Sequence, residues 1–411
     1  MYFRLQGIFY FLQGFFMTGF MVYGGVSLAN WGLPLVQQTA TQATIAIPAY
    51  FKMFTALLSD RVPIWRWGRR KPYIFLGLIL FVPAFAYMFS IQEFSSLWIL
   101  SMATVMAAWV LVDGTLDALT VDITPVVHQG AMQGVANGSR MVGYAAGTVV
   151  VPILGPKIGW STTVGIIALF AVLQGVVALL YKEIPVTRQD LRKQLPVGKV
   201  FKKSFGSAKP WMGILFSLFI AAIGGVSTVT GQYVLTNLGW SKTPQLLSQF
   251  GYSKLVFFIG AAMAAFLFGK LASRFGNSMK FYTASFMGSW VLVLPWFLVP
   301  ASGSNALPIF FAQFSTGLAY GILNVLALGV IMQICDPGIE GFMFATLMSF
   351  SNLGEYALGA NVITNFEGLA GGIIPALFTP VPLTVMGLVF LYFMFRAVAK
   401  EKEKVEMRNE T

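Results

Sequence analysis

The sequence has very few of the residues on which most enzymes rely for chemistry. Its 411 residues include one cysteine, Cys335, and one histidine, His128. A single cysteine excludes an intramolecular disulfide, and these two residues cannot build a Cys/His metal cluster or a nucleophilic Cys/His site. A phosphate-binding loop of the Walker type is also missing, so ATP-driven pumping is not expected. We therefore predict that the protein is not an enzyme and uses no cofactor or metal.

Charged residues are scarce as well. They make up 10% of the chain, hydrophobic residues make up 57%, and the mean hydropathy is +0.74, which excludes a soluble globular domain. Apolar stretches long enough to cross a hydrocarbon core of about 30 Å recur along the whole chain. We expect an all-α, multi-pass protein of the cell membrane, embedded in the lipid bilayer, with twelve transmembrane helices. The expected spans are residues 7–29, 43–59, 72–91, 97–121, 132–154, 161–181, 211–236, 247–271, 279–300, 307–333, 341–363 and 373–396.

The positive charge is distributed in a way that indicates the orientation in the membrane. The formal net charge is +12, which in a soluble protein could indicate nucleic-acid binding. Here 22 of the 27 Lys and Arg residues fall on the side of the membrane that holds the N-terminus, two fall on the other side and three lie within spans. Because cytoplasmic segments carry the excess of Lys and Arg, both termini are predicted to be cytoplasmic, and no nucleic-acid partner is expected.

The longest break between spans divides the chain into two halves. Residues 182–210 carry eight Lys and Arg residues against two acids, so we interpret this segment as a cytoplasmic linker that contacts anionic lipid headgroups. The predicted domains are a six-helix bundle at 1–181, this basic linker at 182–210, a second six-helix bundle at 211–398 and a charged tail at 399–411. The bundles resemble a diverged, pseudo-symmetric repeat. Residues that pair between them at offsets of 211 to 213 are Arg61 with Arg274, Pro125 with Pro337, Gly130 with Gly341, Gly143 with Gly354, and Asp113 with Asn324.

Residues 105–147 contain three charged side chains with apolar or small neighbours. Asp113 and Asp117 are four residues apart, so on a helix both carboxylates leave the same face, and Arg140 comes from the next predicted helix. A charge at the centre of a membrane helix costs at least about 2.5 to 3.5 kcal/mol, so these residues need a partner or a wet cavity. The simplest arrangement is a buried ion pair with Arg140 as countercharge and a second carboxyl that takes up a proton. This predicts proton coupling; a purely structural pair that joins two helices is the alternative.

Other polar residues within the spans are candidates for substrate binding. Lys52 lies midway along the second span, where it could pair with an acid, hold an anionic substrate or extend to the cytoplasmic surface. Glu355 follows Asn352 on nearly one helical face, and an intramembrane carboxylate is a functional candidate because it is costly to bury. Gln232 in the seventh span and Asn324 in the tenth complete the predicted set.

A third basic residue within a span is Lys254. It begins the eighth span, and we expect its side chain to extend outward to the membrane surface. The three bases within spans balance the three acids, which makes stable pairing feasible but does not identify the acid that couples to protons.

The loop after the second span reads SDRVPIWRWGRRKPYI, from Ser59 to Ile74. Together with two six-span halves and a basic central loop, it resembles the major facilitator superfamily, whose members carry at this place an acidic residue, an arginine and then a Gly-Arg-Arg/Lys group. The residues that match are Asp60, Arg61, Gly68, Arg69 and Arg70. The resemblance implies that they gate the protein through charge contacts between the halves. The cations from Arg66 to Lys71 also serve as positive-inside anchors.

Two segments resemble the folate–biopterin transporter family. One is IPAYFKMFTALLSDRVPI, from Ile47 to Ile64, with a Pro-aromatic-x-x-Lys group before Ser-Asp and Pro-Ile. The other is QICDPGIEGFMFATLMSFSNLG, from Gln333 to Gly354, in which Asp336 is inserted into the family's Cys-Pro-x-Gly-x-Glu pattern. The segment DGTLDALTVDITP is also similar to muropeptide permeases and to light-harvesting assembly proteins, so the resemblance supports transport more firmly than it names pterins.

The sequence thus predicts a secondary active transporter that alternates access between its halves and carries protons with its substrate. The substrate is expected to be a small organic solute, for example a folate- or pterin-like anion, because three basic residues lie within spans and the family resemblance implies it. A sugar or muropeptide permease is an open alternative, as is a non-transporting assembly factor for pigment complexes with the same fold. The superfamily resemblance implies a monomer.

Overall fold

The computed structural model describes residues 2–62, 64, 68–124, 128–181, 196–275, 278–302, 305–335 and 339–409. These ranges contain helices and short connections and no β-strand, which confirms the all-α fold class. Pro125 and Pro337 of the predicted repeat and most of the predicted linker, residues 182–195, lie outside the described residues.

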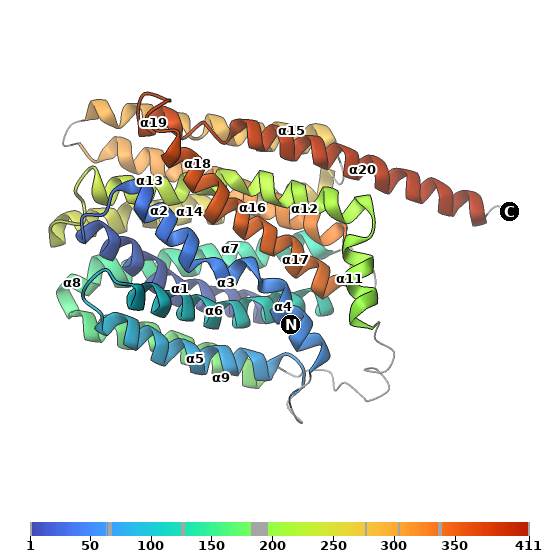
Figure 1. Ribbon diagram of the computed structural model, residues 1–411, viewed down its shortest axis with the longest axis horizontal. Coiled ribbons are helices and arrows are strands. Elements are labelled where there is room, and N and C mark those ends of the chain that lie inside the picture. Colours follow the sequence, from blue (N-terminus) through green and yellow to red (C-terminus); the bar gives the residue numbers. More distant parts are fainter. Residues whose placement is uncertain are drawn as a thin grey trace.

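The first half consists of long helices joined by short connections (Figure 1). Its elements are α1 (Tyr2–Asn30), α2 (Leu35–Ile45), α3 (Ile47–Tyr50), α4 (Lys52–Arg61), α5 (Lys71–Ser90), α6 (Ser96–Ile123), α7 (Gln129–Thr148), the π-helical η3 (Val149–Leu154), α8 (Gly155–Ile158) and α9 (Trp160–Leu180).

The second half begins with a short amphipathic helix and then repeats the pattern of long helices. Its elements are α11 (Val197–Phe205), α12 (Ala208–Ile220), η4 (Ala221–Gly224), α13 (Gly225–Thr236), α14 (Pro244–Phe275), α15 (Met279–Val291), η5 (Leu294–Leu298), η6 (Pro300–Ser302), α16 (Leu307–Gln333), α17 (Glu340–Asn352), the π-helical η7 (Leu353–Gly359), α18 (Ala360–Asn365), α19 (Ile373–Ala376) and α20 (Val381–Asn409). Helix α20 runs on into the predicted tail at 399–411, and α11 lies within the predicted linker.

Ten helical stretches in the described part of the chain are long and apolar enough to cross a membrane. The two expected spans outside this set are the broken segments α2–α4 and α17–α18. The first begins at Leu35, not at residue 43 as predicted. It breaks after Ile45 because Pro48 has no backbone N–H to continue the helical hydrogen bonds. With these two segments the chain would have the predicted twelve spans, and that number stays a prediction.

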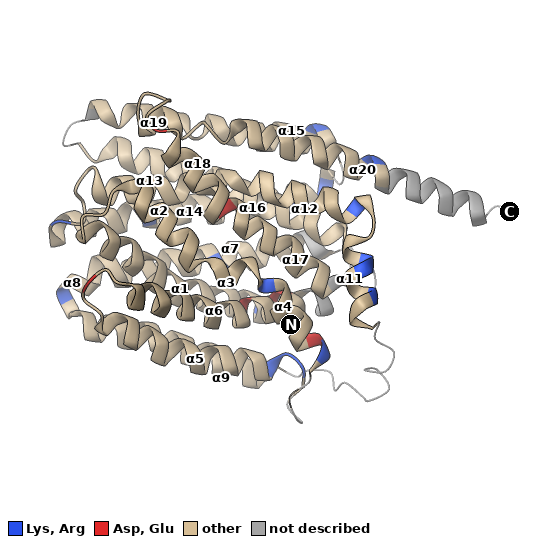
Figure 2. Cartoon of the chain, in the orientation of Figure 1, with Lys and Arg blue, Asp and Glu red and all other residues tan. Residues whose placement is uncertain are grey.

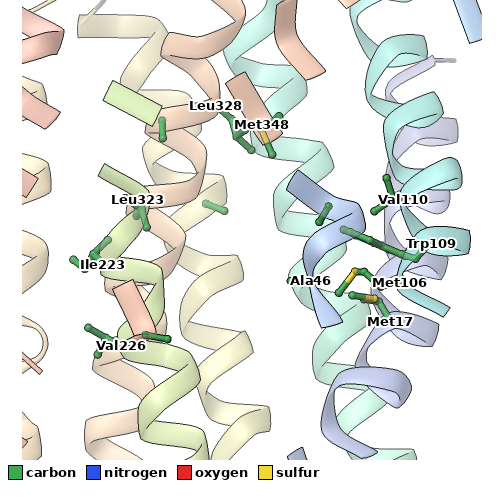
Figure 3. Close-up of a cluster of buried hydrophobic side chains, with 14 of the residues drawn as sticks. Met17, Ala46, Met106, Trp109, Val110, Ile223, Val226, Leu323, Leu328 and Met348 are labelled. Atoms are coloured by element: carbon green, nitrogen blue, oxygen red, sulfur yellow. The ribbon is translucent and has the colours of Figure 1, made fainter. Parts of the chain in front are cut away.

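The helices lie side by side in two bundles. In Figure 1, α5 and α9 form one outer edge and α15 and α20 form the other. Much of α5, α9 and α15 is exposed, as lipid-facing helices require, whereas α16 is mostly buried. The bundles meet where α7 packs along α14 and α4 packs against α17. Figure 3 shows buried side chains from both halves, with Met17 and Trp109 from the first and Ile223 and Met348 from the second.

Paired glycines support the pseudo-symmetry of the halves. Gly143 on α7 packs against the backbone of Phe11 on α1, and Gly354 on η7 packs against the backbone of Leu218 on α12. Because a glycine lets two helix backbones approach closely, each pair joins the first helix of its half to the fifth segment of the same half. The predicted offset of 211 residues therefore relates two equivalent helix contacts.

Basic side chains gather at one end of the molecule. Figure 2 shows Lys and Arg concentrated at the end that holds α11 and the end of α4, with few at the opposite end. Both chain termini lie toward that same end in Figure 1. The positive-inside rule assigns the end that is rich in Lys and Arg to the cytoplasm. The cytoplasmic location of both termini stays a prediction.

Candidate functional site

A buried cluster of four charged side chains lies in the first half. Lys52 on α4 forms ion pairs with both Asp113 and Asp117 on α6. Arg140 on α7 places its Nη2 at 2.8 Å from Asp113 Oδ1 and 3.7 Å from Asp117 Oδ1. All four residues are buried, and two cations balance two anions, so the charge cluster is neutral as a whole. The structure brings together the three residues predicted for proton coupling and adds Lys52 to them.

Helix α1 supplies uncharged partners for the two acids. Gln13 Nε2 donates a hydrogen bond of 2.8 Å to Asp113 Oδ1, and the Tyr10 hydroxyl donates one of 2.6 Å to Asp117 Oδ1. The guanidinium carbon of Arg140 lies 4.6 Å from the centroid of the Tyr10 ring. Gly14 lets α1 approach the backbone of Arg140 directly, which holds these partners against the cluster. Sequence reasoning missed Tyr10, because nothing local relates it to an acid 107 residues away.

Of the possible roles of Lys52, pairing with an acid is the one that this geometry fits. The residue is fully buried and contacts two carboxylates at once, so an anionic substrate would have to displace both. It does not line the central cavity described next. The sequence prediction placed Lys52 among the substrate-binding residues; we now place it within the charge cluster.

A central cavity of about 170 Å³ lies between the two halves. Side chains from α1, α2, α6 and α7 of the first half and from α13, α14, α16 and η7 of the second half line it. Its polar and charged lining includes Gln42, Ser227, Thr228, Gln232, Lys254 and Glu355. Its aromatic lining includes Phe20, Tyr144, Phe250, Phe257, Phe258, Tyr320 and Tyr356. Of the predicted substrate-binding residues, Gln232 and Glu355 therefore face the cavity.

Lys254 also lines the central cavity, which corrects the expectation that it extends to the membrane surface. Helix α14 begins at Pro244, ten residues earlier, so Lys254 lies about 15 Å along the helix from its start. Its side chain is only 9% exposed, and its Nζ donates to the Ser227 carbonyl at 3.3 Å. The predicted span began at residue 247, which made Lys254 look closer to the surface than it is.

Asn324 and Asn352 do not line this cavity. Asn324 Nδ2 donates to the Tyr320 carbonyl at 3.0 Å on its own helix. Asn352 Nδ2 donates to the Ala49 carbonyl at 3.2 Å, a bond that joins α17 to α3. Asn352 thus connects the two halves, and a substrate-binding role for either residue has no support in this geometry.

Tyr144 connects the charge cluster to the central cavity. It follows Arg140 by four residues on α7, so both side chains leave the same helical face. Its ring lies 5.1 Å from that of Phe258, and it packs with Tyr320 around a small apolar cluster that contains Met141. The charge cluster is therefore one helical turn away from the cavity wall.

The predicted gating residues lie at the end of the molecule that carries the basic side chains. Arg70 is almost fully buried and binds Asp60 Oδ1 and Ser59 Oγ, each at 2.6 Å. Arg69 lies 4.0 Å from Asp60. A Cβ atom at Gly341, in the first turn of α17, would lie 3.3 Å from Asp60 Oδ2. The Asp60–Arg70 pair thus contacts the second half.

Two further residues of the predicted gating group shape this loop. Arg61 is the last residue of α4. Gly68 has a φ of +94°, a conformation that side chains other than glycine rarely adopt. Among the described residues, no group of three His, Cys, Asp or Glu side chains is placed to hold a metal ion.

Comparisons with solved structures show the fold, and a match to a sequence family shows the superfamily. The chain resembles the solved structure of the E. coli fucose:proton symporter FucP, with 15% identity, a TM-score of 0.60 and coverage of 95% of this chain and 98% of that one. It also resembles the human organic anion transporter MFSD10, with 16% identity, a TM-score of 0.62 and coverage of 94% and 97%. No curated protein matches the sequence. The sequence pattern described as Major Facilitator Superfamily matches residues 6–354, and the chain belongs to that superfamily.

Proposed function

We propose that this protein is a secondary active transporter that moves a small organic solute together with protons. The observation that carries the proposal is the neutral charge cluster of Lys52, Asp113, Asp117 and Arg140, one helical turn from a cavity between the two halves. Secondary transport is the activity typical of the superfamily, and the structural neighbour FucP is named a fucose:proton symporter. Buried charges in a membrane protein are costly, and proton relays are one use that justifies the cost.

Asp117 is the acid to which we assign the proton. Asp113 forms ion pairs with Lys52 and Arg140 and accepts a hydrogen bond from Gln13. Asp117 is paired with Lys52 and Tyr10, while Arg140 lies farther away, at 3.7 Å. Protonation of Asp117 leaves Asp113 with both cations, so the cluster can change charge without leaving an unpaired carboxylate.

The substrate we favour is a small organic anion, with a folate- or pterin-like compound as the first class to test. Lys254 supplies a cation to the cavity, and the seven Phe and Tyr rings that line the cavity suit a flat ring system. A volume of about 170 Å³ is below the range of roughly 300–1,000 Å³ that drug-sized ligands occupy. In this conformation a single ring system fits better than a muropeptide.

A sugar is the second candidate, supported by a different part of the lining. Gln42, Ser227, Thr228 and Gln232 face the cavity, and amide and hydroxyl groups of this kind bind sugar hydroxyls without any charge. A sugar would leave the Lys254 ammonium group without an ionic partner, which is why we rank a sugar below an anion.

The test is uptake into proteoliposomes that hold the purified protein. We expect an inward proton gradient to drive accumulation of a labelled pterin, folate or sugar, and collapse of the gradient to abolish it. Asp117→Asn should lose accumulation but keep exchange of internal for external solute, because exchange needs no net proton movement. Glu93 is an exposed carboxylate between α5 and α6. The variant Glu93→Gln is the matched control and should behave like the unaltered protein. Equal uptake with and without the gradient would contradict proton coupling, and stable co-purification of pigment without uptake would favour an assembly factor.

A further inference from the structure

Two oppositely charged side chains face the central cavity without ionic partners. Lys254 Nζ donates a hydrogen bond to the Ser227 carbonyl and lies 5.0 Å from the ring centroid of Phe257. Glu355 accepts a hydrogen bond of 3.1 Å from the Tyr320 hydroxyl. Among the described residues, neither has an oppositely charged group within 4.0 Å. Because burying an unpaired charge is costly, both are suited to groups that a solute brings in.

Two glycines on one helix indicate roughly how far apart these charges lie. A Cβ atom at Gly224 would lie 2.9 Å from Glu355 Cδ, and a Cβ atom at Gly231 would lie 2.8 Å from Lys254 Nζ. The glycines are seven residues apart along η4–α13, which is two turns, so they share one face and lie about 10 Å apart along the helix. A solute that bridges the two charges would form a charged hydrogen bond of about 2.8 Å at each end. Subtracting these two bonds from the separation of about 10 Å leaves roughly 5 Å between the polar groups of the solute.

Gln232 provides an independent sign that a ligand is expected here. The residue is only 5% exposed and lines the cavity. Within the part of the chain that the structure describes, its Oε1 has no hydrogen-bond partner. Buried amide oxygens are normally paired. The unpaired oxygen indicates that this part of the cavity is suited to a polar ligand.

We propose that the central cavity binds a flat aromatic solute with a carboxylate at one end, held by Lys254, and an amine at the other end, held by Glu355. This inference rests on the proposed function and narrows its substrate to aminoaryl carboxylates. The two charges select against compounds that carry only one of the groups, and their separation selects against compounds whose groups are adjacent. The rings of Phe257 and Phe258 and the small volume favour a single flat ring system.

The test compares four simple probes for binding to the purified protein in detergent. They are 4-aminobenzoate, its isomer 2-aminobenzoate, benzoate and aniline, measured by thermal shift and calorimetry. We expect 4-aminobenzoate to bind at least about tenfold more tightly than each of the others, since each lost charged hydrogen bond weakens binding by that order. Equal affinity of the two isomers would overturn the proposal, as would absence of binding by all four.

Two variants show which residue of the cavity binds the carboxylate of the probe and which binds its amine. Lys254→Met should weaken 4-aminobenzoate and benzoate about tenfold and leave aniline unchanged. Glu355→Gln should weaken 4-aminobenzoate and aniline and leave benzoate unchanged. The unchanged probe shows in each case that the variant is folded. Lys242→Met and Glu93→Gln make the same chemical changes at exposed positions and should leave all four affinities as they are; the proposal fails if Lys254→Met weakens every probe equally.

Binding in detergent needs no proton gradient, so this experiment is independent of the coupling test. If the isomers bind equally while a gradient still drives uptake of another solute, the substrate class is wrong and the proposed function stands. If 4-aminobenzoate binds as expected but no gradient drives its uptake, the site is correct and proton coupling is wrong.

Discussion

At the scale of single residues, Lys52 holds two carboxylates on successive turns of α6. Replacing it with methionine would leave Asp113 and Asp117 with one guanidinium, and an uncompensated buried charge destabilises by about 3 to 5 kcal/mol. We expect Lys52→Met to lower the unfolding temperature of the purified protein markedly. The double variant Lys52→Met/Asp117→Asn should recover most of the loss, because the remaining Arg140–Asp113 pair is neutral. A double variant less stable than Lys52→Met would show that the cluster is not held by charge balance.

Gly231 offers a second residue-scale prediction, because it can displace Lys254 without removing its charge. A Cβ atom at this position would lie 2.8 Å from the Nζ and 3.0 Å from the Cε of Lys254. The end of a lysine is flexible, so Gly231→Ala should move the ammonium group and leave the fold intact. We expect benzoate binding to weaken about tenfold with an unchanged unfolding temperature. Gly288→Ala, on α15 where a Cβ would meet nothing within 4 Å, is the control for the substitution itself.

At the scale of elements, the packing of α1 on α7 holds the charge cluster together. A Cβ atom at Gly143 would lie 2.9 Å from the carbonyl carbon of Phe11 and 3.0 Å from the amide nitrogen of Phe15. Backbone atoms cannot move aside as a side chain can. Gly143→Val should therefore separate the helices, with a loss of about 1 to 3 kcal/mol, and weaken gradient-driven uptake because Tyr10 and Gln13 leave the acids. Gly165→Val, exposed on α9 with nothing within 4 Å, should change neither the unfolding free energy nor uptake.

The elements also show which parts of the fold were predictable. Long apolar helices such as α16 were placed from hydropathy alone, with the expected bounds 307–333. The second span was predicted to begin eight residues too late because Gln38 and Thr39 read as a polar connection. Both are buried and bond to Thr236 and Thr364 of the other half. Hydropathy measures affinity for lipid and cannot recognise a polar residue that faces another helix.

The candidate site was predictable only where its residues lie close together in the sequence or on consecutive helices. Asp113 and Asp117 share a face by spacing alone, and Arg140 follows from the next helix. The pairing of Lys52 with both acids joins residues 61 and 65 positions apart, and its orientation depends on the break in the helix just before it. Lys254 and Glu355 come together only when two spans more than 100 residues apart pack on α13. Such contacts depend on tertiary packing, and local patterns in a single sequence do not predict which distant residues pack together.

At the scale of the whole molecule, contacts between the halves lie on both sides of the central cavity. At the end opposite α11, Gln38 Nε2 donates to Thr236 Oγ1 at 2.9 Å, and the hydroxyls of Thr39 and Thr364 lie 3.1 Å apart. Toward the other end, the Met53 amide donates to Ser349 Oγ at 3.1 Å. Alternating access requires one set of contacts to open while the other stays closed. If the protein works as proposed, we expect each set of contacts to act as a gate, so that locking either one stops transport.

The gate at Thr39 and Thr364 can be locked with a disulfide. Close hydroxyls on facing helices occupy the positions of two cysteine sulfurs, and Cys335 is the only native cysteine. In a Cys335→Ser background, we expect oxidised Thr39→Cys/Thr364→Cys to lose gradient-driven uptake and to recover it when a reductant is added. Each single cysteine variant should transport with or without oxidant, which separates the crosslink from the substitutions. Loss of maleimide labelling would report the extent of crosslinking. Full uptake by a crosslinked protein would mean that this end does not open, and that the two halves do not alternate access as proposed.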